Sequence, residues 1–329
     1  MIRVGIIGFG KMGQIRAKAV EESGKANVLY FYEENAVEFT GNKFERVSSI
    51  DKVIHAPEID AIFICTPNYL NKPLTIKALQ AGKHVFCEKP PAFTAYDVEE
   101  IMAAEERSGK KLMYGFNHRH HESLRHMKDL IDSGGYGKVL WLRGRYGKSV
   151  DEAYFDTWRA KKEFAGGGIL LDQGIHMLDL FTMMAGDFDA VKADVSNLYW
   201  NLDIEDNVFA IYKNSKTGVV ASLHSTMTQW RHLFSLEVFL EQGYMVINGL
   251  KTSSGTYGDE ILSIAKNRSA APAATWQDEE HITFPTNNSW SSETGHFFDA
   301  IENDRMIEFG SSGDALRIMK LIDMTYKEA

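Results

Sequence analysis

The sequence has few cysteines, no long apolar run and no excess of basic residues. Its 329 residues include only Cys65 and Cys87, both in apolar, strand-like stretches. We therefore expect two buried reduced thiols and neither a disulfide nor a catalytic thiol. No run of about 18 apolar residues occurs, so no membrane-spanning helix is expected. The formal net charge is −9 and no basic stripe is present, so we expect no binding to nucleic acid.

The N-terminus also lacks targeting features. Residues 1–7 have the pattern of a strand that leads into a glycine turn, without the basic start, apolar stretch and cleavage site of a signal peptide. A cytoplasmic protein is therefore expected. The contents of 44% hydrophobic and 25% charged residues are ordinary for a globular protein, and the length indicates two domains.

The first third of the chain alternates short apolar strands with helices. We expect strands at 2–7, 27–32, 59–65, 84–87 and 111–115, and helices at 12–23, 71–81 and 95–108. Continuous apolar strands separated by helices indicate a parallel sheet that is covered on both faces. The fold class predicted for residues 1–117 is therefore an α/β domain with a doubly wound parallel sheet of the Rossmann type.

The pattern changes after residue 118. Helices are expected at 122–133, 169–185 and 312–328, and strands from 139 and at 191–200, 207–214, 219–226, 235–240 and 244–248. Short turns at 215–218 and 241–243 imply antiparallel pairing. Residues 118–329 are thus predicted to form an α+β domain, a large open sheet with helices on one face. Ser312 is the expected N-cap of the last helix. The uncovered apolar face predicts a homodimer or homotetramer that assembles through this sheet.

A glycine turn follows the first strand. Gly8, Gly10 and Gly13 match G-x-G-x-x-G, the turn that lets a helix N-terminus approach a pyrophosphate. Glu33 lies 20 residues after Gly13, at the end of the second strand, where a carboxylate binds the adenine ribose. Glu34 is the neighbouring candidate. A carboxylate there repels a 2′-phosphate, so we predict NAD as the cofactor, with NADP disfavoured.

Three further segments carry a family resemblance. Residues 66–68 close an apolar strand with Thr-Pro-Asn, residues 78–90 read ALQAGKHVFCEKP, and residues 167–176 read GGILLDQGIH. In this order they resemble the family of glucose–fructose oxidoreductase and inositol dehydrogenase (Gfo/Idh/MocA). Two positions depart from the family pattern. Asn71 stands where a histidine is usual. Residues 116–119 read Phe-Asn-His-Arg, and Arg119 is not followed by the phenylalanine that is commoner in the family.

The resemblance implies that Lys89, Asp172 and His176 form the catalytic group. Oxidation of an alcohol needs a base for the hydroxyl proton, and a histidine with an ordinary pKa of about 6.5 suits that role. His176 is the favoured base and Lys89 would lower the pKa of the hydroxyl, although either residue could hold the transferred proton. The spacing of Asp172 and His176 places both on one face of an α-helix. The glycine run at 166–168 is expected to let this helix start near the cofactor.

The same resemblance and the local context name the candidate binding residues. Those for the cofactor are Gly8, Phe9, Gly10, Lys11, Met12, Gly13, Glu33, Thr66, Pro67, Asn68, Asn71, Glu88, Lys89 and Asn117. Those for the substrate are Lys89, Asn117, Arg119, Tyr146, Trp158, Arg159, Asp172, Gln173 and His176. The aromatic side chains among them suit the C–H surfaces of a sugar, and Arg159 suits an anionic group. Six of the substrate candidates have an alternative role, in packing or in a structural ion pair. These are Asn117, Arg119, Tyr146, Trp158, Arg159 and Gln173.

Two further expectations concern metals and activity. The histidines at 118, 120, 121 and 126 match no metal-ligand spacing, so no metal is expected and a solvated loop is predicted. The predicted activity is NAD-dependent hydride transfer at a secondary hydroxyl of a free sugar, a cyclitol or a nucleotide-linked sugar. Two alternatives remain, a glycosidase of the same family that uses NAD transiently and a non-catalytic sensor of NAD or sugar.

Overall fold

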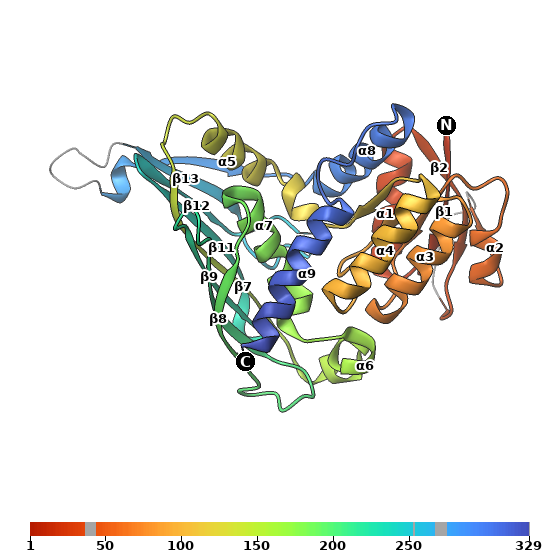
Figure 1. Ribbon diagram of the computed structural model, residues 1–329, viewed down its shortest axis with the longest axis horizontal. Helices are drawn as coiled ribbons and strands as arrows, with labels where there is room; N and C mark the ends of the chain where they lie inside the picture. Colours follow the sequence, from red (N-terminus) through yellow and green to blue (C-terminus); the bar gives the residue numbers. More distant parts are fainter. Residues whose placement is uncertain (37–43, 253, 267–274, 329) are drawn as a thin grey trace. The chain divides into compact units, whose positions relative to one another are not determined.

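The computed structural model describes residues 1–36, 44–252, 254–266 and 275–328 (Figure 1). The chain forms two compact units. Unit 1 consists of Met1–Asn117 and Ser289–Met319, and unit 2 consists of His118–Asn288 and the residues from Lys320 onward. The expected second domain over 118–329 is therefore interrupted, because residues 289–319 pack with the first unit.

Unit 1 contains a parallel sheet of six strands in the order β3-β2-β1-β4-β5-β6. The strands are β1 (Ile2–Ile7), β2 (Ala26–Tyr32), β3 (Glu45–Arg46), β4 (Ala61–Ile64), β5 (His84–Cys87) and β6 (Leu112–Tyr114). The helices are α1 (Lys11–Glu22), α2 (Ile50–Ile54), α3 (Asn71–Gln80), α4 (Ala95–Ser108) and α8 (Ser289–Glu302). The strand order reverses between β1 and β4, which is the switch point of a doubly wound sheet. The predicted Rossmann sheet is confirmed.

Helix α8, which the sequence pattern did not predict, completes the core of unit 1. Phe297 and Phe298 are both fully buried. The ring centroid of Phe297 lies 5.7 Å from those of Phe63 on β4 and Phe86 on β5, in edge-to-face contact. Such aromatic pairs add to the free energy gained by apolar burial. This packing explains why a segment from late in the chain belongs to the first unit.

Unit 2 contains an eight-stranded sheet in the order β14-β13-β12-β11-β7-β10-β9-β8. Its strands are β7 (Val139–Ser149), β8 (Ala190–Ser196), β9 (Asn207–Lys213), β10 (Val220–Thr226), β11 (Thr228–Leu240), β12 (Gly243–Asn248), β13 (Glu260–Lys266) and β14 (Glu280–Phe284). All pairs are antiparallel except β7 with β10, so the predicted mainly antiparallel sheet is confirmed. Strands β13 and β14 were not predicted.

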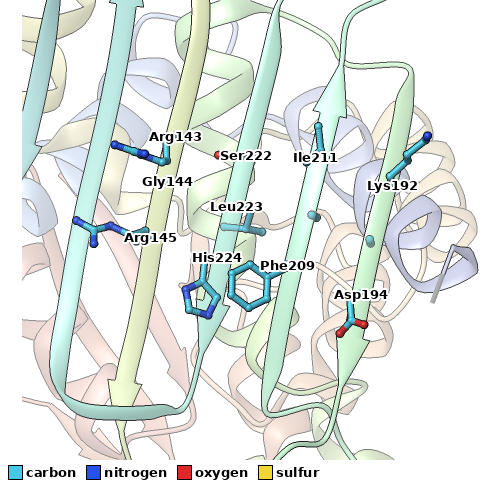
Figure 2. Close-up of a pocket in the computed structure, with 12 residues that line it drawn as sticks. Arg143, Gly144, Arg145, Lys192, Asp194, Phe209, Ile211, Ser222, Leu223 and His224 are labelled. Atoms are coloured by element: carbon cyan, nitrogen blue, oxygen red, sulfur yellow. The ribbon is translucent and has the colours of Figure 1, made fainter.

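The two faces of this sheet differ in their cover. Helices α5 (Glu122–Asp132) and α7 (Ile175–Ala185) pack on one face (Figure 1). Figure 2 shows the opposite face, where Arg143 on β7 and Phe209 and Ile211 on β9 project on either side of β10, around a hollow of about 520 Å³. Phe209 and Ile211 are 51% and 52% exposed. From Val208 to Lys213, buried and exposed residues alternate along β9, which is the pattern of a sheet with one covered face.

Ser312 was predicted as the N-cap of the last helix, which implies that the helix begins after it. Helix α9 (Ser312–Lys327) instead includes Ser312 as its first residue. The Ser311 hydroxyl accepts a hydrogen bond from the backbone N–H of Asp314, and the Asp314 carboxylate accepts one from the N–H of Ser311. This is a reciprocal capping box, so Ser311 is the N-cap and the prediction of Ser312 was wrong. Along the described ranges, no helix combines the length and apolar character needed to cross a membrane.

Candidate active site

The glycine turn is shaped by two close backbone contacts and one open position. Gly8 has a φ of +88°, and a Cβ there would lie 2.5 Å from the carbonyl oxygen of Cys65. A Cβ on Gly13 would lie 2.1 Å from the carbonyl oxygen of Gly8. In contrast, a Cβ on Gly10 meets no described atom within 4 Å. Gly8 and Gly13 are thus required by packing, whereas Gly10 borders the open side from which a ligand can approach the backbone.

The N-terminus of α1 suits an anionic group. The structure describes all of α1. The first turn of this helix has no acidic side chain, and its N-cap is Gly10, so no side chain caps the first N–H groups. The first N–H groups of a helix have no partner within the helix, and the helix dipole favours negative charge at this end. The turn and helix therefore fit the pyrophosphate of a dinucleotide.

Glu33 lies beside the glycine turn, immediately after β2. Its Oε2 accepts a hydrogen bond of 2.7 Å from the backbone N–H of Phe9. The Phe9 ring is fully buried against Phe31, with centroids 4.1 Å apart, so Phe9 serves the turn through its backbone. Arg46 donates from Nη2 to the carbonyl oxygen of Glu33 at 2.6 Å. The carboxylate and the turn are thus adjacent, as dinucleotide binding requires.

Asn71 braces the turn that carries Lys89. Its fully buried amide nitrogen donates to the carbonyl oxygens of Glu88 at 3.2 Å and Pro90 at 2.8 Å. Its Oδ1 accepts a hydrogen bond of 3.2 Å from the hydroxyl of Thr66. These bonds hold the backbone on both sides of Lys89, which is half-buried. The structure therefore places Asn71 in the support of the turn, and its contact with the cofactor stays a prediction.

Glu88 also supports this turn from within the core. Its Oε1 accepts from Nε of Arg16 at 2.7 Å, and Nη1 of Arg16 lies 2.6 Å from Oε2 of Glu293 on α8. Burial opposes the charge of Arg16, but the carboxylates of Glu293 and Glu88 raise the pKa of Arg16 above its ordinary value. Through Arg16, the Glu88 carboxylate thus joins the Lys89 turn to α1 and α8, and its part in cofactor binding stays a prediction.

The helix predicted over 169–185 begins with a different winding. Residues Leu170–Gly174 form a π-helical turn (η5), in which the N–H of Ile175 bonds to the carbonyl of Leu170, and α7 follows directly. Asp172 lies in the π-helical turn and His176 lies in the first turn of α7. The expectation of one α-helical face through both residues is thus corrected. π-Helical turns occur frequently at functional sites.

Asp172 forms an ion pair with Lys148, a residue that the sequence analysis did not single out. Nζ of Lys148 lies 2.5 Å from Oδ2 of Asp172 and 4.6 Å from the centre of the Tyr154 ring. The Lys148 side chain is only 11% exposed. Tyr146, two positions earlier on β7, is buried on the same face. The sequence held one signal for Lys148, because this lysine occupies an inward-facing position of a strand whose side chains alternate between the two faces.

His176 is buried and stacks on His118. The two ring centroids lie 3.9 Å apart with an interplanar angle of 19°, and His176 is 5% exposed. Nε2 of His118 lies 3.1 Å from the hydroxyl of Tyr146. Burial raises the pKa of Tyr146 well above its ordinary value, so its hydroxyl stays protonated. Tyr146, a predicted substrate residue, is thus a hydrogen-bond partner of His118.

The predicted solvated histidine loop is wrong, because three of its four histidines are buried in unit 2 and His126 is half-buried. His118, His120 and His121 are all buried. Nδ1 of His121 lies 2.9 Å from Oε2 of Glu260, whose pKa is held below its ordinary value by His121 and Ser123 although burial opposes this. Within the described ranges, no group of three or more His, Cys, Asp or Glu side chains is arranged to hold a metal ion.

Arg119 and Gln173 were predicted to contact substrate. Nε of Arg119 donates to both carboxylate oxygens of the fully buried Asp179, at 2.8 and 2.9 Å. This buried pair fastens α7 to the 3-10 turn Asn117–His120, so Arg119 takes the structural alternative considered for it. Gln173 donates from Nε2 to the hydroxyl of Tyr257 at 2.5 Å.

The remaining candidates lie in separate places. Trp158 is half-buried, and the guanidinium carbon of Arg159 lies 4.3 Å from its ring centre. Asn117 is buried in unit 1, where its amide donates to the hydroxyl of Ser289 at 3.2 Å. Asn68 is also buried in unit 1.

The glycine run at 166–168 has a different cause from the one expected. A Cβ on Gly167 would lie 2.3 Å from the hydroxyl oxygen of Tyr326, and one on Gly168 would lie 2.0 Å from the carbonyl oxygen of Glu205. The Glu205 carboxylate accepts from the N–H groups of Gly168 and Leu170, at 2.8 and 3.0 Å. Within unit 2, the run therefore lets the start of the π-helical turn pack against Glu205 and the C-terminal helix.

Together, these features define a class of protein. The dinucleotide-binding turn with its adjacent carboxylate lies in unit 1, and a buried histidine follows an ion-paired aspartate in unit 2. This combination is that of a nicotinamide-dependent oxidoreductase. The model of the oxidoreductase family with an NAD-binding Rossmann fold matches residues 2–116, and that of the GFO/IDH/MocA C-terminal domain matches residues 124–246. The chain belongs to the Gfo/Idh/MocA family.

Individual relatives agree with this assignment. The chain is 28% identical over 230 residues to the 1,5-anhydro-D-fructose reductase of Ensifer adhaerens, covering 69% of this chain and 68% of that protein. A levoglucosan dehydrogenase in complex with NADH and levoglucosan shares the fold, with a TM-score of 0.86, 24% identity and coverage of 100% and 97%. A 3-ketoreductase from Actinomadura kijaniata in complex with NADP and TDP-benzene also shares it, with a TM-score of 0.84, 23% identity and coverage of 100% and 98%.

Proposed function

We propose that this chain is an NAD-dependent dehydrogenase that moves a hydride between the nicotinamide and a secondary hydroxyl of a sugar, a cyclitol or a nucleotide-linked sugar. The observation that carries the proposal is the buried His176 directly after the ion-paired Asp172, in a member of an oxidoreductase family. Relatives named for an anhydro sugar support the substrate class.

The three catalytic side chains have separate roles in the oxidation of an alcohol. The bound cofactor supplies the acceptor for the hydride that leaves the carbon. A ring nitrogen of His176 takes the proton that leaves the hydroxyl oxygen. The ammonium of Lys89 donates a hydrogen bond to this oxygen and lowers the pKa of the hydroxyl. The carboxylate of Asp172 accepts a hydrogen bond from a neighbouring hydroxyl and so orients the substrate.

The stack of His118 on His176 disfavours a charge on both rings at once. Two imidazolium charges with ring centres 3.9 Å apart repel each other strongly in a buried site. The stack therefore favours at most one proton on the two rings near neutral pH. A neutral His176 is the form that can accept the proton from an alcohol.

For the cofactor, we propose NAD over NADP. The Glu33 carboxylate lies at the glycine turn, where it would accept hydrogen bonds from the ribose hydroxyls and repel a 2′-phosphate. Arg46, the nearby cation, donates to the carbonyl oxygens of Glu33 and Asn35. The test is the ratio of kcat/KM for NAD to that for NADP. A ratio well above one that falls in E33A supports the assignment, and a preference for NADP in the unaltered protein contradicts it.

We also propose that the open face of the unit 2 sheet forms a homodimer or homotetramer interface. Phe209 and Ile211 are more than half exposed on this face (Figure 2). Apolar side chains gathered on one open face mark an interaction surface. Sedimentation at micromolar concentration tests this proposal, and a monomer would contradict it.

The main experiment is a screen of inositols, aldoses, uronates and nucleotide sugars for NADH formation by the purified protein. Net NADH from at least one of these alcohols is the expected result. An enzyme that uses NAD transiently would instead carry tightly held NAD through purification and release product without net NADH. That outcome would overturn the proposed dehydrogenase.

A further inference from the structure

Lys148 connects the π-helical turn to a loop of unit 2. Its ammonium lies 2.5 Å from Oδ2 of Asp172 and 4.6 Å from the centre of the Tyr154 ring. Tyr154 lies in the 3-10 turn Glu152–Asp156, and its hydroxyl donates to the carbonyl oxygen of Arg159 at 3.2 Å. One cation thus fixes Asp172 and, through an aromatic ring, the backbone of the segment that carries Trp158 and Arg159.

The burial of this pair gives the contact its strength. The side chains of Lys148 and Asp172 are 11% and 23% exposed, so solvent screens their attraction less than it screens a surface pair. An ammonium at hydrogen-bond distance stabilises a carboxylate relative to its neutral acid. The contact also restricts the rotation of the Asp172 carboxylate, because one of its oxygens stays on Nζ.

We propose that Lys148 is a positioning residue that keeps Asp172 ionised and correctly oriented to accept a substrate hydroxyl. This role rests on the proposed function of Asp172. Lys148 acts through Asp172 and the loop, whereas His176 and Lys89 handle the reacting hydroxyl. Without the ammonium, the Asp172 carboxylate would lose the contact that holds its Oδ2 and would be protonated at a higher pH.

Four described side chains of unit 2 that sense the charges of this pair do not replace the ammonium. Tyr146, Tyr154 and Tyr257 face Asp172, and burial raises the pKa of each, so all three are neutral near pH 7. His232 is close enough to feel the charge of Lys148, and burial together with that charge lowers the pKa of His232. Lys148 therefore supplies a positive charge directly at Asp172, whereas the hydrogen bond of Arg159 here is made by its carbonyl oxygen, which accepts from Tyr154.

The experiment compares K148M, K148Q and K148R with the control K128M. Lys128 is also ion-paired to a carboxylate, that of Asp132, but on the exposed surface of α5. The first readout is kcat/KM against pH for the best alcohol of the screen. The second is independent of activity: the titration midpoint of the Asp172 carboxyl by carbon-13 NMR of labelled aspartate, assigned with D172N. Circular dichroism verifies that each variant is folded.

The expected results separate positioning from a merely structural role. K148M and K148Q lower kcat/KM by about 100-fold at pH 7, the size of effect that a misplacement of about 1 Å produces. Their acid limb and their Asp172 midpoint rise by about one pH unit or more. K148R retains most of the activity and the unaltered midpoint, and K128M matches the unaltered protein in both readouts.

Two outcomes would overturn the inference. One is a folded K148M or K148Q with an unaltered pH profile and an unaltered Asp172 midpoint. The other is K148R behaving as poorly as K148M in both readouts, because a retained cation should preserve the role. If the unaltered protein oxidises no alcohol of the screen, the proposed function fails, and the NMR midpoint still tests the Lys148–Asp172 pair separately.

Discussion

Substitution of Asn71 by alanine tests how the Lys89 turn is held. The buried Asn71 amide donates to the carbonyl oxygens of Glu88 and Pro90. In N71A the Pro90 carbonyl loses its donor inside the core, whereas the Glu88 carbonyl keeps the thiol of Cys87 at 3.3 Å. An unsatisfied buried group costs about 1–3 kcal/mol, so the expected loss is about 1–3 kcal/mol of unfolding free energy. This is a large part of the about 5–15 kcal/mol that stabilises a typical domain. The released turn should also lower kcat, because Lys89 loses its fixed position.

The assay is urea unfolding followed by circular dichroism, with hydrogen exchange over residues 84–90 as the local readout. The matched control is N27A, because Asn27 is exposed on β2 and its loss should change stability by less than about 0.5 kcal/mol. N71A should also accelerate exchange in the 84–90 segment. A loss below about 1 kcal/mol with unaltered exchange would refute the role of Asn71 as a brace.

Three further predictions concern buried charges and rings. Burial lowers the pKa of His84 to about 4, below its ordinary 6.5. The stabilising contribution of the neutral ring is therefore complete above pH 6.5 and is lost as the pH falls toward 4. In H84Q the unfolding free energy measured in urea should change less with pH over this window. R119M removes the guanidinium from the buried pair with Asp179 and should cost about 3–5 kcal/mol in the same assay. H118F removes the ring stacked on His176 and should shift the acid limb of kcat/KM, whereas an unchanged pH profile would exclude coupling between the rings.

Five of the six strands of unit 1 were predictable because they are largely apolar runs, and buried parallel strands need no further pattern. The two-residue β3 (Glu45–Arg46) is exposed and charged, so it carries no such signal. The extra helix α8 was not predictable in the same way. Its Phe297 and Phe298 form a short apolar group in a polar stretch, and sequence periodicity does not specify which sheet such a helix covers.

The candidate site was predictable only where its residues share a local motif. Gly8, Gly13 and Glu33 follow a fixed spacing, and the structure brings Glu33 to the turn. Lys148 and His118 reach Asp172 and His176 through contacts between segments far apart in sequence. Such partners depend on strand register and helix packing, which local spacing does not encode. The same reason explains why Arg119 pairs with Asp179.

Transfer of a labelled hydride tests the central claim most directly. The purified protein is incubated with NAD and the best alcohol of the screen, deuterated at the carbon that carries the hydroxyl. Mass spectrometry of the reduced cofactor should show one deuterium per turnover, and H176A should form this product about 100- to 10,000-fold more slowly. Reduced cofactor without deuterium, or an H176A variant with unaltered turnover, would contradict direct hydride transfer with His176 as the base.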